Sequence, residues 1–328
     1  MKNRTNTAMM RIAIAGAGGF AYILAQEITK SANAVLVLSR QAHPEFEEDF
    51  PSLQVAVVDF GNVEELRYVL QGVDLLISTI SAAEQLNLID AARRARVRLF
   101  VPSEFEGSIS HRPATQDPLD RGSQAALGLL QRCSQSRPHS MQYTVFSCGL
   151  FMERFGPGGL QSYNLGGSTS VQNPNDYIVD VANATGEIIE TNVQGRPVRV
   201  NLTSVYDVAR FVAAAIELGP ASWPREFCMR GDNMSVRDII TACSTVRRVP
   251  FNLSVHSYQA AEAEAEYCQQ NAEWPRWHYF QRLLATANGR YHFTQANLND
   301  TVNTAGSGVE VRPLNFRQWL EQVWGPAM

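Results

Sequence analysis

The segment "RLFVPSEFEGS" (98–108) brings reactive side chains together directly after an apolar run. Ser103 offers a hydroxyl, Glu104 and Glu106 offer carboxylates, and Phe105 offers an aromatic ring. A carboxyl group beside an apolar pocket can serve as a general acid or base, because desolvation raises its pKa toward neutrality. The same residues also suit a polar turn in which a carboxylate braces the loop. The segment therefore predicts either an active-site edge or a structural turn.

A second chemical signal follows the first apolar run, in "GAGGFA" (16–21). Gly16, Gly18 and Ala21 match G-x-G-x-x-G/A, and Gly16 and Gly19 match the first half of G-x-x-G-x-x-G, with Phe20 at the same turn. Glycines let the chain turn tightly and let backbone N–H groups approach a pyrophosphate at a helix N-terminus. The position of the motif, between a strand and a helix, favours a dinucleotide site over a plain turn.

The end of the second apolar run indicates which dinucleotide binds. Ser39 and Arg40 stand where an NAD-specific fold would place an acidic residue for the ribose 2′-hydroxyl. A guanidinium instead suits a 2′-phosphate, so NADP(H) is favoured over NAD(H), with a surface arginine as the alternative. Other strand ends supply further expected cofactor contacts, to the adenine from Asp59 and Phe60 and to the nicotinamide from Thr79, Ile80 and Ser81. Cys148 and Gly149 are also expected to bind the cofactor.

The elements that position these residues alternate in the first half of the chain. Short, β-branched apolar runs predict strands of a parallel sheet that is covered on both faces. Helix-compatible segments lie between them, which gives a βαβ series and the fold class α/β with a doubly wound parallel sheet. The expected strands are 11–16, 34–39, 54–60, 73–80, 97–103 and 142–149, and the expected helices are 20–31, 62–71, 82–95 and 121–136.

The second half of the chain lacks the regular alternation of strands and helices seen in the first half. Residues 156–170 are rich in Gly and Ser and predict a loop. Residues 204–219 predict an amphipathic helix, capped by Ser204 with Asp207 at the capping-box position. Further expected elements are a strand, turn and helix within 227–248, an exposed helix at 260–266 and a helix ending near Gly289. The chain thus divides into a dinucleotide-binding domain (1–150) and an interleaved substrate-binding part (151–328).

Composition narrows the function classes for this chain of 328 residues. Hydrophobic residues make up 45% and charged residues 18%, and the net charge is −4. This balance gives no electrostatic reason to expect nucleic acid or an anionic membrane as a partner. The chain contains no run of about 20 apolar residues, and its start lacks the apolar stretch of a secretory signal. Five cysteines without C-x-x-C spacing predict free thiols in the cytoplasm, and the histidines show no metal-ligand spacing.

With these residues in place, the chain resembles the NmrA-like and isoflavone-reductase-like branch of the atypical short-chain dehydrogenase/reductases, closer to its fungal secondary-metabolism members. The resemblance implies a Rossmann domain that holds NADPH and a smaller C-terminal α/β part that covers the nicotinamide and forms the substrate pocket. The motifs that carry it span nearly the whole chain: "IAIAGAGG", "VLSR", "VPSEFEG", "YTVFSCGLFMERF", "GRPVRVNLTSVYDVARFVAAAIE", "MRGDNMSVRDI" and "NFRQWLEQVW".

Two departures from the family pattern matter. Tyr22 stands where the third glycine is usual, which places the helix slightly further from the pyrophosphate. The family's reductases keep a lysine after the Pro-Ser-Glu motif that orients or protonates the substrate oxygen, and here that position falls on Gln124. An amide can donate a hydrogen bond but cannot supply a proton near neutral pH. Lys2 and Lys30 are the only lysines in the sequence, so chemistry that depends on a lysine is excluded.

The missing lysine makes Glu104 the leading candidate for an acid or base, with Ser103 orienting the substrate through its hydroxyl. Glu106 is expected to be a solvated turn residue. The substrate pocket is expected to take a flat hydrophobic molecule, neutral or cationic, with cation–π contact holding a cation and with half at most of the candidates touching the substrate. The candidates are Phe105, Phe151, Met152, Phe155, Trp274 and Trp277, with His278 and Tyr279 beside them.

Three hypotheses follow for a protein expected to be a monomer or homodimer. The first is an NADPH-dependent reductase of an aromatic or alkaloid-like imine, ketone or enone. The second is a redox-silent enzyme that keeps NADP(H) as the floor of its pocket while Glu104 drives a Pictet–Spengler-type condensation of an indole amine with an aldehyde. The third is a regulator that senses NADP without catalysis, although a sensor has no need for an aromatic pocket.

Overall fold

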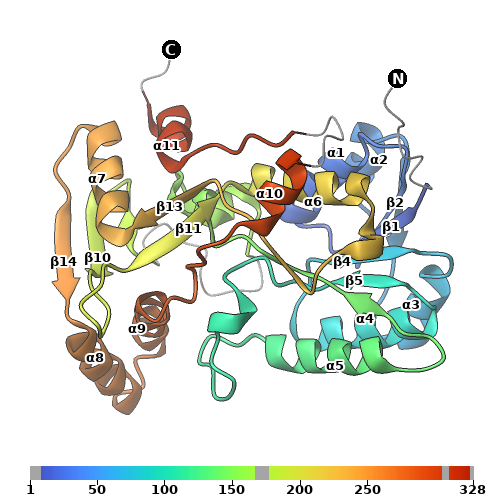
Figure 1. Ribbon diagram of the computed structural model, residues 1–328, viewed down its shortest axis with the longest axis horizontal. Helices are drawn as coiled ribbons and strands as arrows, with labels where there is room; N and C mark the ends of the chain where they lie inside the picture. Colours follow the sequence, from blue (N-terminus) through green and yellow to red (C-terminus); the bar gives the residue numbers. More distant parts are fainter. Residues whose placement is uncertain (1–8, 167–176, 305–309, 326–328) are drawn as a thin grey trace.

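The computed structural model describes residues 9–166, 177–304 and 310–325, and a six-stranded parallel sheet forms its larger part (Figure 1). The strand order is β3-β2-β1-β4-β5-β6, and every neighbouring pair is parallel. This order reverses between β1 and β4, as in a doubly wound dinucleotide-binding fold, so the predicted fold class is confirmed. The strands are β1 (Arg11–Ala15), β2 (Ala34–Ser39), β3 (Leu53–Val57), β4 (Leu75–Ser78), β5 (Leu99–Val101) and β6 (Gln142–Tyr143).

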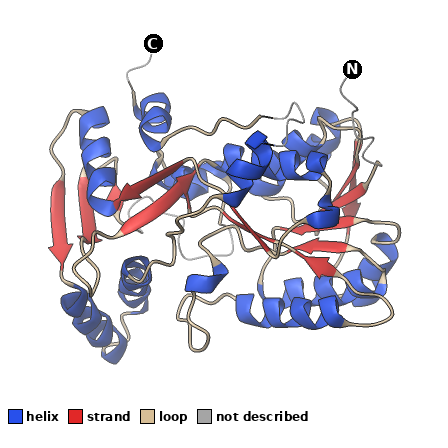
Figure 2. Ribbon diagram, in the orientation of Figure 1, coloured by secondary structure: helices blue, strands red, loops and turns tan. Residues whose placement is uncertain are grey.

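Helices cover both faces of this sheet, which explains why its central strands are apolar throughout (Figure 2). Alternate residues of β1 point to opposite faces, with Ile12 and Ile14 in one core and Ala13 and Ala15 in the other. The first core is closed by α1 (Gly19–Ile28) and α6 (Val205–Leu218), and the second by α3 (Val63–Val69), α4 (Ala82–Arg94) and α5 (Ser123–Gln135). One further helix, α2 (Pro44–Asp49), was not predicted, because six residues are too few for a helical period to register.

The described residues after the main sheet form three smaller sheets and five more α-helices beyond α6, and part of this half returns to the main sheet. Helix α6 packs on α1, and α10 packs on α6, so the two halves interleave. The boundary at residue 150 remains a prediction. The smaller sheets are β7 (Val145–Ser147) with β12 (Glu226–Cys228), β8 (Leu150–Phe151) with β11 (Arg199–Thr203) and β13 (Asp232–Ser235), and β9 (Val179–Asp180) with β10 (Thr185–Ile189) and β14 (Asn252–His256). The helices are α7 (Val236–Arg247), α8 (Tyr258–Gln270), α9 (Trp274–Ala287), α10 (Asn297–Thr304) and α11 (Phe316–Trp324).

Two expectations for this half need correction. The segment predicted as loop contains a short 3₁₀ helix, Gly159–Tyr163, and its residues 167–170 lie outside the described part of the chain. Ser204 does stand at the N-cap of α6, but its hydroxyl donates to Glu153 (2.6 Å), and the N–H of Val205 donates to the same carboxylate (2.9 Å). Asp207 instead accepts the N–H of Leu314 (3.0 Å), so the predicted capping box is wrong.

The buried cap at Glu153 makes a testable contribution to the pH dependence of stability. Burial raises the pKa of Glu153 to about 7, although Ser204 and Val205 donate to its carboxylate. A carboxyl whose pKa is higher in the folded than in the unfolded state stabilises the protein below the unfolded pKa. That contribution is lost as the pH rises through the folded pKa. Titration of Glu153 should therefore lower the free energy of unfolding of the wild type by about 3 kcal/mol between pH 4.5 and 8. The variant Glu153→Gln should lack this decrease.

Urea unfolding of both proteins at pH 5, 6, 7 and 8 measures this difference. Other titrating groups cancel in the comparison, including Asp207, whose pKa burial also raises. Parallel pH profiles for the wild type and the variant would show that Glu153 stays ionised across this range.

Candidate functional site

A cavity of about 1260 Å³ lies along the carboxyl ends of the parallel strands, where open α/β sheets bind ligands. It exceeds the roughly 300–1,000 Å³ of a typical small-molecule pocket, and so has room for a cofactor and a second ligand. Its lining extends from Ser39 and Arg40, past the glycine turn at 16–20 and the segment 79–84, to Phe105, Phe151 and Tyr291. The two halves of the chain therefore enclose one continuous site.

The glycine turn shows the geometry that a dinucleotide phosphate requires. Gly16 has φ +107°, and a Cβ there would lie 2.2 Å from Oγ1 of Thr79, which donates to the carbonyl of Ala15 (2.8 Å). Gly18 is the N-cap of α1, and a Cβ there would have the carbonyl oxygen of Asn164 as its nearest atom, 3.5 Å away. The first-turn N–H groups of α1 have no intrahelical acceptors, so the helix N-terminus can receive an anion.

Gly19 has a role that the motif did not indicate. Its N–H donates to the carbonyl of Asn164 (3.0 Å), and a Cβ there would lie 2.0 Å from the carbonyl oxygen of Tyr163. Gly19 thus allows residues 159–166 to pack against the turn, and it does not itself line the cavity. This docking segment contributes Leu160, Asn164, Leu165 and Gly166 to the cavity wall.

Tyr22, which replaces the usual third glycine, points away from the turn. Its hydroxyl donates to Asp49 (2.5 Å), and its ring packs edge-on against Phe46 at a centroid distance of 5.2 Å. The bulk of this side chain is therefore absorbed by α2 rather than by the space over the glycine turn.

The predicted cofactor residues fall into two groups. Asp59 and Cys148 are not among the cavity-lining residues: the Asp59 carboxylate accepts the N–H of Gly61 (2.8 Å), and the Cys148 thiol is fully buried. The exposed Arg40 lies 3.6 Å from Glu84, a long ion pair that leaves the guanidinium at the cavity edge. The predicted residues that line the cavity are Gly16, Gly18, Phe20, Ser39, Arg40, Phe60, Thr79, Ile80, Ser81 and Gly149.

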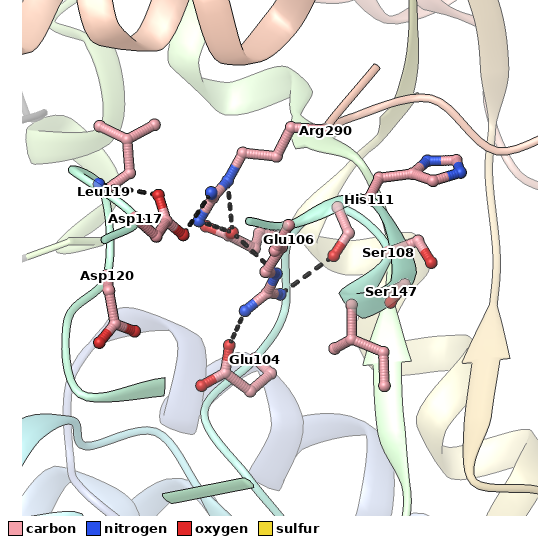
Figure 3. Close-up of polar contacts among 12 residues, drawn as sticks. Glu104, Glu106, Ser108, His111, Asp117, Leu119, Asp120, Ser147 and Arg290 are labelled. Atoms are coloured by element: carbon pink, nitrogen blue, oxygen red, sulfur yellow. Dashed lines mark hydrogen bonds and ion pairs between the residues drawn. The ribbon is translucent and has the colours of Figure 1, made fainter. Parts of the chain in front are cut away.

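The carboxylates of Glu104 and Glu106, in the segment 98–108, point in different directions (Figure 3). Glu104 is buried and forms an ion pair with Arg112 (2.5 Å), whose side chain is also buried. Glu104 does not line the cavity, whereas Ser103 does. The predicted acid/base role requires a carboxyl that faces the cavity, so this arrangement favours the alternative in which Glu104 braces the loop. Gln124 is exposed, donates to the carbonyl of Pro113 (3.1 Å) and also lies off the cavity.

Glu106 lines the cavity, which corrects the expectation of a solvated turn residue. Arg290 donates to its Oε1 from two nitrogens (2.8 and 3.0 Å), and Nε of Arg112 lies 3.5 Å from the same oxygen. Burial alone would raise the pKa of Glu106, but the guanidinium groups of Arg112, Arg290 and Arg121 together outweigh it and lower the pKa. Arg290 also pairs with Asp117 (2.7 Å), so the salt-bridge network runs Glu104–Arg112–Glu106–Arg290–Asp117.

The predicted substrate residues divide in the same way. Phe105 and Phe151 line the cavity and pack on Phe20, with ring centroids 4.6 and 5.7 Å from its own. Four others do not line it: Met152 and Phe155 are in the core of the second half, Trp274 is exposed on α9, and Trp277 packs against that core. Of the two residues expected beside these candidates, His278 lines the cavity and Tyr279 does not. Residues that line this end of the cavity but were not predicted are Arg121, Arg154, Arg282 and Tyr291.

Three further features concern possible metal ligands, the cysteines and membrane spans. Among the residues that the structure describes, no group of three or more His, Cys, Asp or Glu side chains could hold a metal ion. All five cysteines are free thiols. In the same described ranges, no helix combines the length and apolarity needed to cross a membrane.

The strand order, the glycine turn at the point where that order reverses, and the cavity above it define a protein of the Rossmann class. The model of the NmrA-like family matches residues 9–260, and the chain belongs to this family. A curated relative is "Oxidoreductase swnR" of Metarhizium robertsii, which is 24% identical over 249 residues, 70% of this chain and 71% of that protein.

Solved structures share the fold at low sequence identity. A crystal structure of isoflavone reductase is 16% identical with a TM-score of 0.67, over 96% of this chain and 99% of that chain. The Citrobacter sp. triphenylmethane reductase complexed with NADP(H) is 14% identical with a TM-score of 0.66, over 95% of this chain and 99% of that chain. The NADPH-dependent quinone oxidoreductase of Escherichia coli is 14% identical with a TM-score of 0.64, over 95% and 98%.

Proposed function

We propose that the protein is an NADP(H)-dependent reductase of a flat, hydrophobic substrate, an aromatic or alkaloid-like imine, ketone or enone. The observation that carries this proposal is the continuity of the cavity from Arg40 to Phe151. Phe20 follows the glycine turn and contacts both Phe105 and Phe151, so the dinucleotide end and the aromatic end share one wall. Similar proteins named as oxidoreductases, and similar folds solved with NADP(H), support the same function.

The residues that fit the cofactor follow the length of the cavity. Gly16 and Gly18, with the N-terminus of α1, would hold the pyrophosphate, and Ser39 and Arg40 would hold the 2′-phosphate. Phe60 would lie against the adenine. Thr79, Ile80, Ser81 and Gly149 would border the nicotinamide, which supplies a hydride when NADPH is bound.

The proton supply separates this proposal from its alternatives. Ser103 lines the cavity and can orient a substrate atom or a water molecule, but it is too weak an acid to replace a lysine. The cyclase hypothesis needs an acid or base in the cavity, and the contact of Glu104 with Arg112 argues against Glu104 in that role. The aromatic lining of the cavity argues against a regulator without a substrate.

One assay tests the proposed function against both alternatives. Purified protein is incubated with NADPH and iminium, ketone, enone or amine-plus-aldehyde substrates, while nicotinamide absorbance and product mass are followed together. We expect a reduced product in equal amount to the NADPH consumed. A condensation product without NADPH consumption would identify a cyclase, and NADP binding without any product would identify a sensor.

The preference for NADP(H) is tested at Arg40. A charge-assisted hydrogen bond contributes about 1.5–3 kcal/mol, so we expect Arg40→Ala to raise the KM for NADPH about 10- to 100-fold. The KM for NADH, which lacks the 2′-phosphate, should not change. Arg67→Ala is the matched control, because Arg67 is an exposed arginine that pairs with Glu64 away from the cavity. Equal effects of Arg40→Ala on both coenzymes would exclude a 2′-phosphate contact.

A further inference from the structure

The carboxylate of Glu106 stands at the aromatic end of the cavity, and the chain fixes it from two directions. Its backbone carbonyl accepts the N–H groups of Cys148 (2.8 Å) and Gly149 (3.0 Å). Arg290 contacts Oε1 of its side chain from two nitrogens (2.8 and 3.0 Å), and Nε of Arg112 lies 3.5 Å from the same oxygen. A carboxylate held through one oxygen directs the other, Oε2, away from the guanidinium groups. Because Glu106 lines the cavity, that oxygen is placed to meet a ligand.

Glu106 can only accept a hydrogen bond. Arg112, Arg290 and the nearby Arg121 keep it ionised, and an ionised carboxylate has no proton to donate. The network in which it takes part holds three carboxylates, Glu104, Glu106 and Asp117, against the two guanidinium groups of Arg112 and Arg290. Its formal charge is therefore −1, and the nearby Arg121 offsets that charge. What Glu106 offers a ligand is thus a fixed acceptor oxygen, which suits an N–H donor.

We propose that Glu106 determines specificity by accepting a hydrogen bond from the N–H of a protonated imine, so that the substrate is a ring-containing iminium ion rather than a ketone or an enone. This inference rests on the proposed reductase function and names its substrate class. A ketone oxygen is itself an acceptor, and an ionised carboxylate repels it. Hydride addition to an iminium carbon moves the C=N electron pair to nitrogen and cancels its charge, so the step needs no proton donor.

The other side chains at this end of the cavity fit a preference for the iminium that comes from its contact with Glu106. The rings of Phe105 and Phe151 can lie against the face of a flat cation. Arg121, Arg154 and Arg282 also line the cavity, so its total charge does not select a cation. Selection comes from the direct contact with Oε2 of Glu106, and the arginines suit acceptor atoms elsewhere on the substrate.

The chain offers a matched pair of variants for the test. Glu104→Gln and Glu106→Gln both remove a negative charge beside Arg112, but only residue 106 faces the cavity. The probes are 1,2,3,4-tetrahydroisoquinolinium, a cation with N–H donors, and 1-tetralone, a neutral ketone of similar shape. Calorimetric titration with NADP⁺ present measures their binding. Turnover of 3,4-dihydroisoquinolinium and of 1-tetralone is measured in parallel with NADPH.

We expect Glu106→Gln to weaken cation binding and kcat/KM for the iminium about tenfold or more, with no change in binding of 1-tetralone. Glu104→Gln should leave this selectivity intact, and Glu106→Asp, which keeps the charge, should restore part of it. Equal loss for cation and ketone, or the same loss in Glu104→Gln, would overturn the role of Glu106. If the proposed reductase function is wrong but Glu106 has this role, the cation should still bind selectively, while NADPH is consumed with none of the substrates.

Discussion

Replacing Arg290 by methionine is expected to lower the free energy of unfolding by about 3–5 kcal/mol, since breaking a buried ion pair leaves an uncompensated charge. The side chains of Arg290 and Asp117 are only 3% and 4% exposed, and their ion pair is 2.7 Å long. Arg290 also donates twice to Glu106. The methionine variant keeps most of the volume of the side chain, but it leaves the buried Asp117 carboxylate unpaired and leaves Glu106 without its contacts to Arg290. Urea unfolding at pH 7 measures the loss.

Two comparisons separate this effect from a general loss of packing. Arg237→Met removes an ion pair with Glu190 in which both partners are well exposed, and it should cost about 1 kcal/mol or less. The double variant Arg290→Met/Asp117→Asn also removes the unpaired charge of Asp117, so it should recover part of the lost free energy of unfolding. A double variant no more stable than Arg290→Met would mean that lost packing, rather than an unpaired charge, causes the change.

The fold was predictable because its determinants are local. The central strands β1 and β4 are buried on both faces, so an uninterrupted apolar run marks each of them. The helices of the first half repeat their apolar residues over two or more turns. The exceptions are short or depend on distant partners. Helix α2 has six residues, and the cap of α6 is a carboxylate 51 residues earlier in the chain, Glu153.

The candidate site was predictable only as far as the backbone decides it. The ends of parallel strands meet at one edge of the sheet, which is why Ser39, Thr79 and Phe105 line the same cavity. Which of two neighbouring carboxylates faces that cavity depends on their partners. Arg290 lies 184 residues beyond Glu106 in the chain, and the sequence carries no local sign of their contact.

Helix α9 is a second case in which the sequence does not show which side chains face the cavity. Its first turns are aromatic on several sides, so helical spacing does not indicate which face meets the cavity. Trp274 and Trp277 turn away, whereas His278 and Arg282, one turn apart, line the cavity. Burial and the nearby Arg282 lower the pKa of His278. A neutral imidazole can then accept a hydrogen bond from a ligand.

The glycine turn carries the second large expected effect, and its glycines should respond differently to alanine. A Cβ at Gly18 meets no protein atom closer than 3.5 Å, so Gly18→Ala should leave the unfolding temperature of the ligand-free protein unchanged. If a pyrophosphate lies over this turn, the added methyl occupies the space that it needs. We expect the Kd for NADPH to rise about 100-fold, a loss of about 2.7 kcal/mol.

Gly16→Ala and Gly19→Ala should damage the fold itself. At Gly16 the backbone has φ +107° and the Cβ would lie 2.2 Å from Oγ1 of Thr79, while at Gly19 it would lie 2.0 Å from the carbonyl oxygen of Tyr163. Both variants should therefore unfold at lower temperature even without ligand. The strained backbone at Gly16 alone should lower the free energy of unfolding by about 1–3 kcal/mol. Calorimetric titration with NADPH and thermal unfolding of the three variants separate the two effects. NADPH binding to Gly18→Ala as tight as to the wild type would show that this turn does not hold the pyrophosphate, because nothing else in the turn opposes that methyl group.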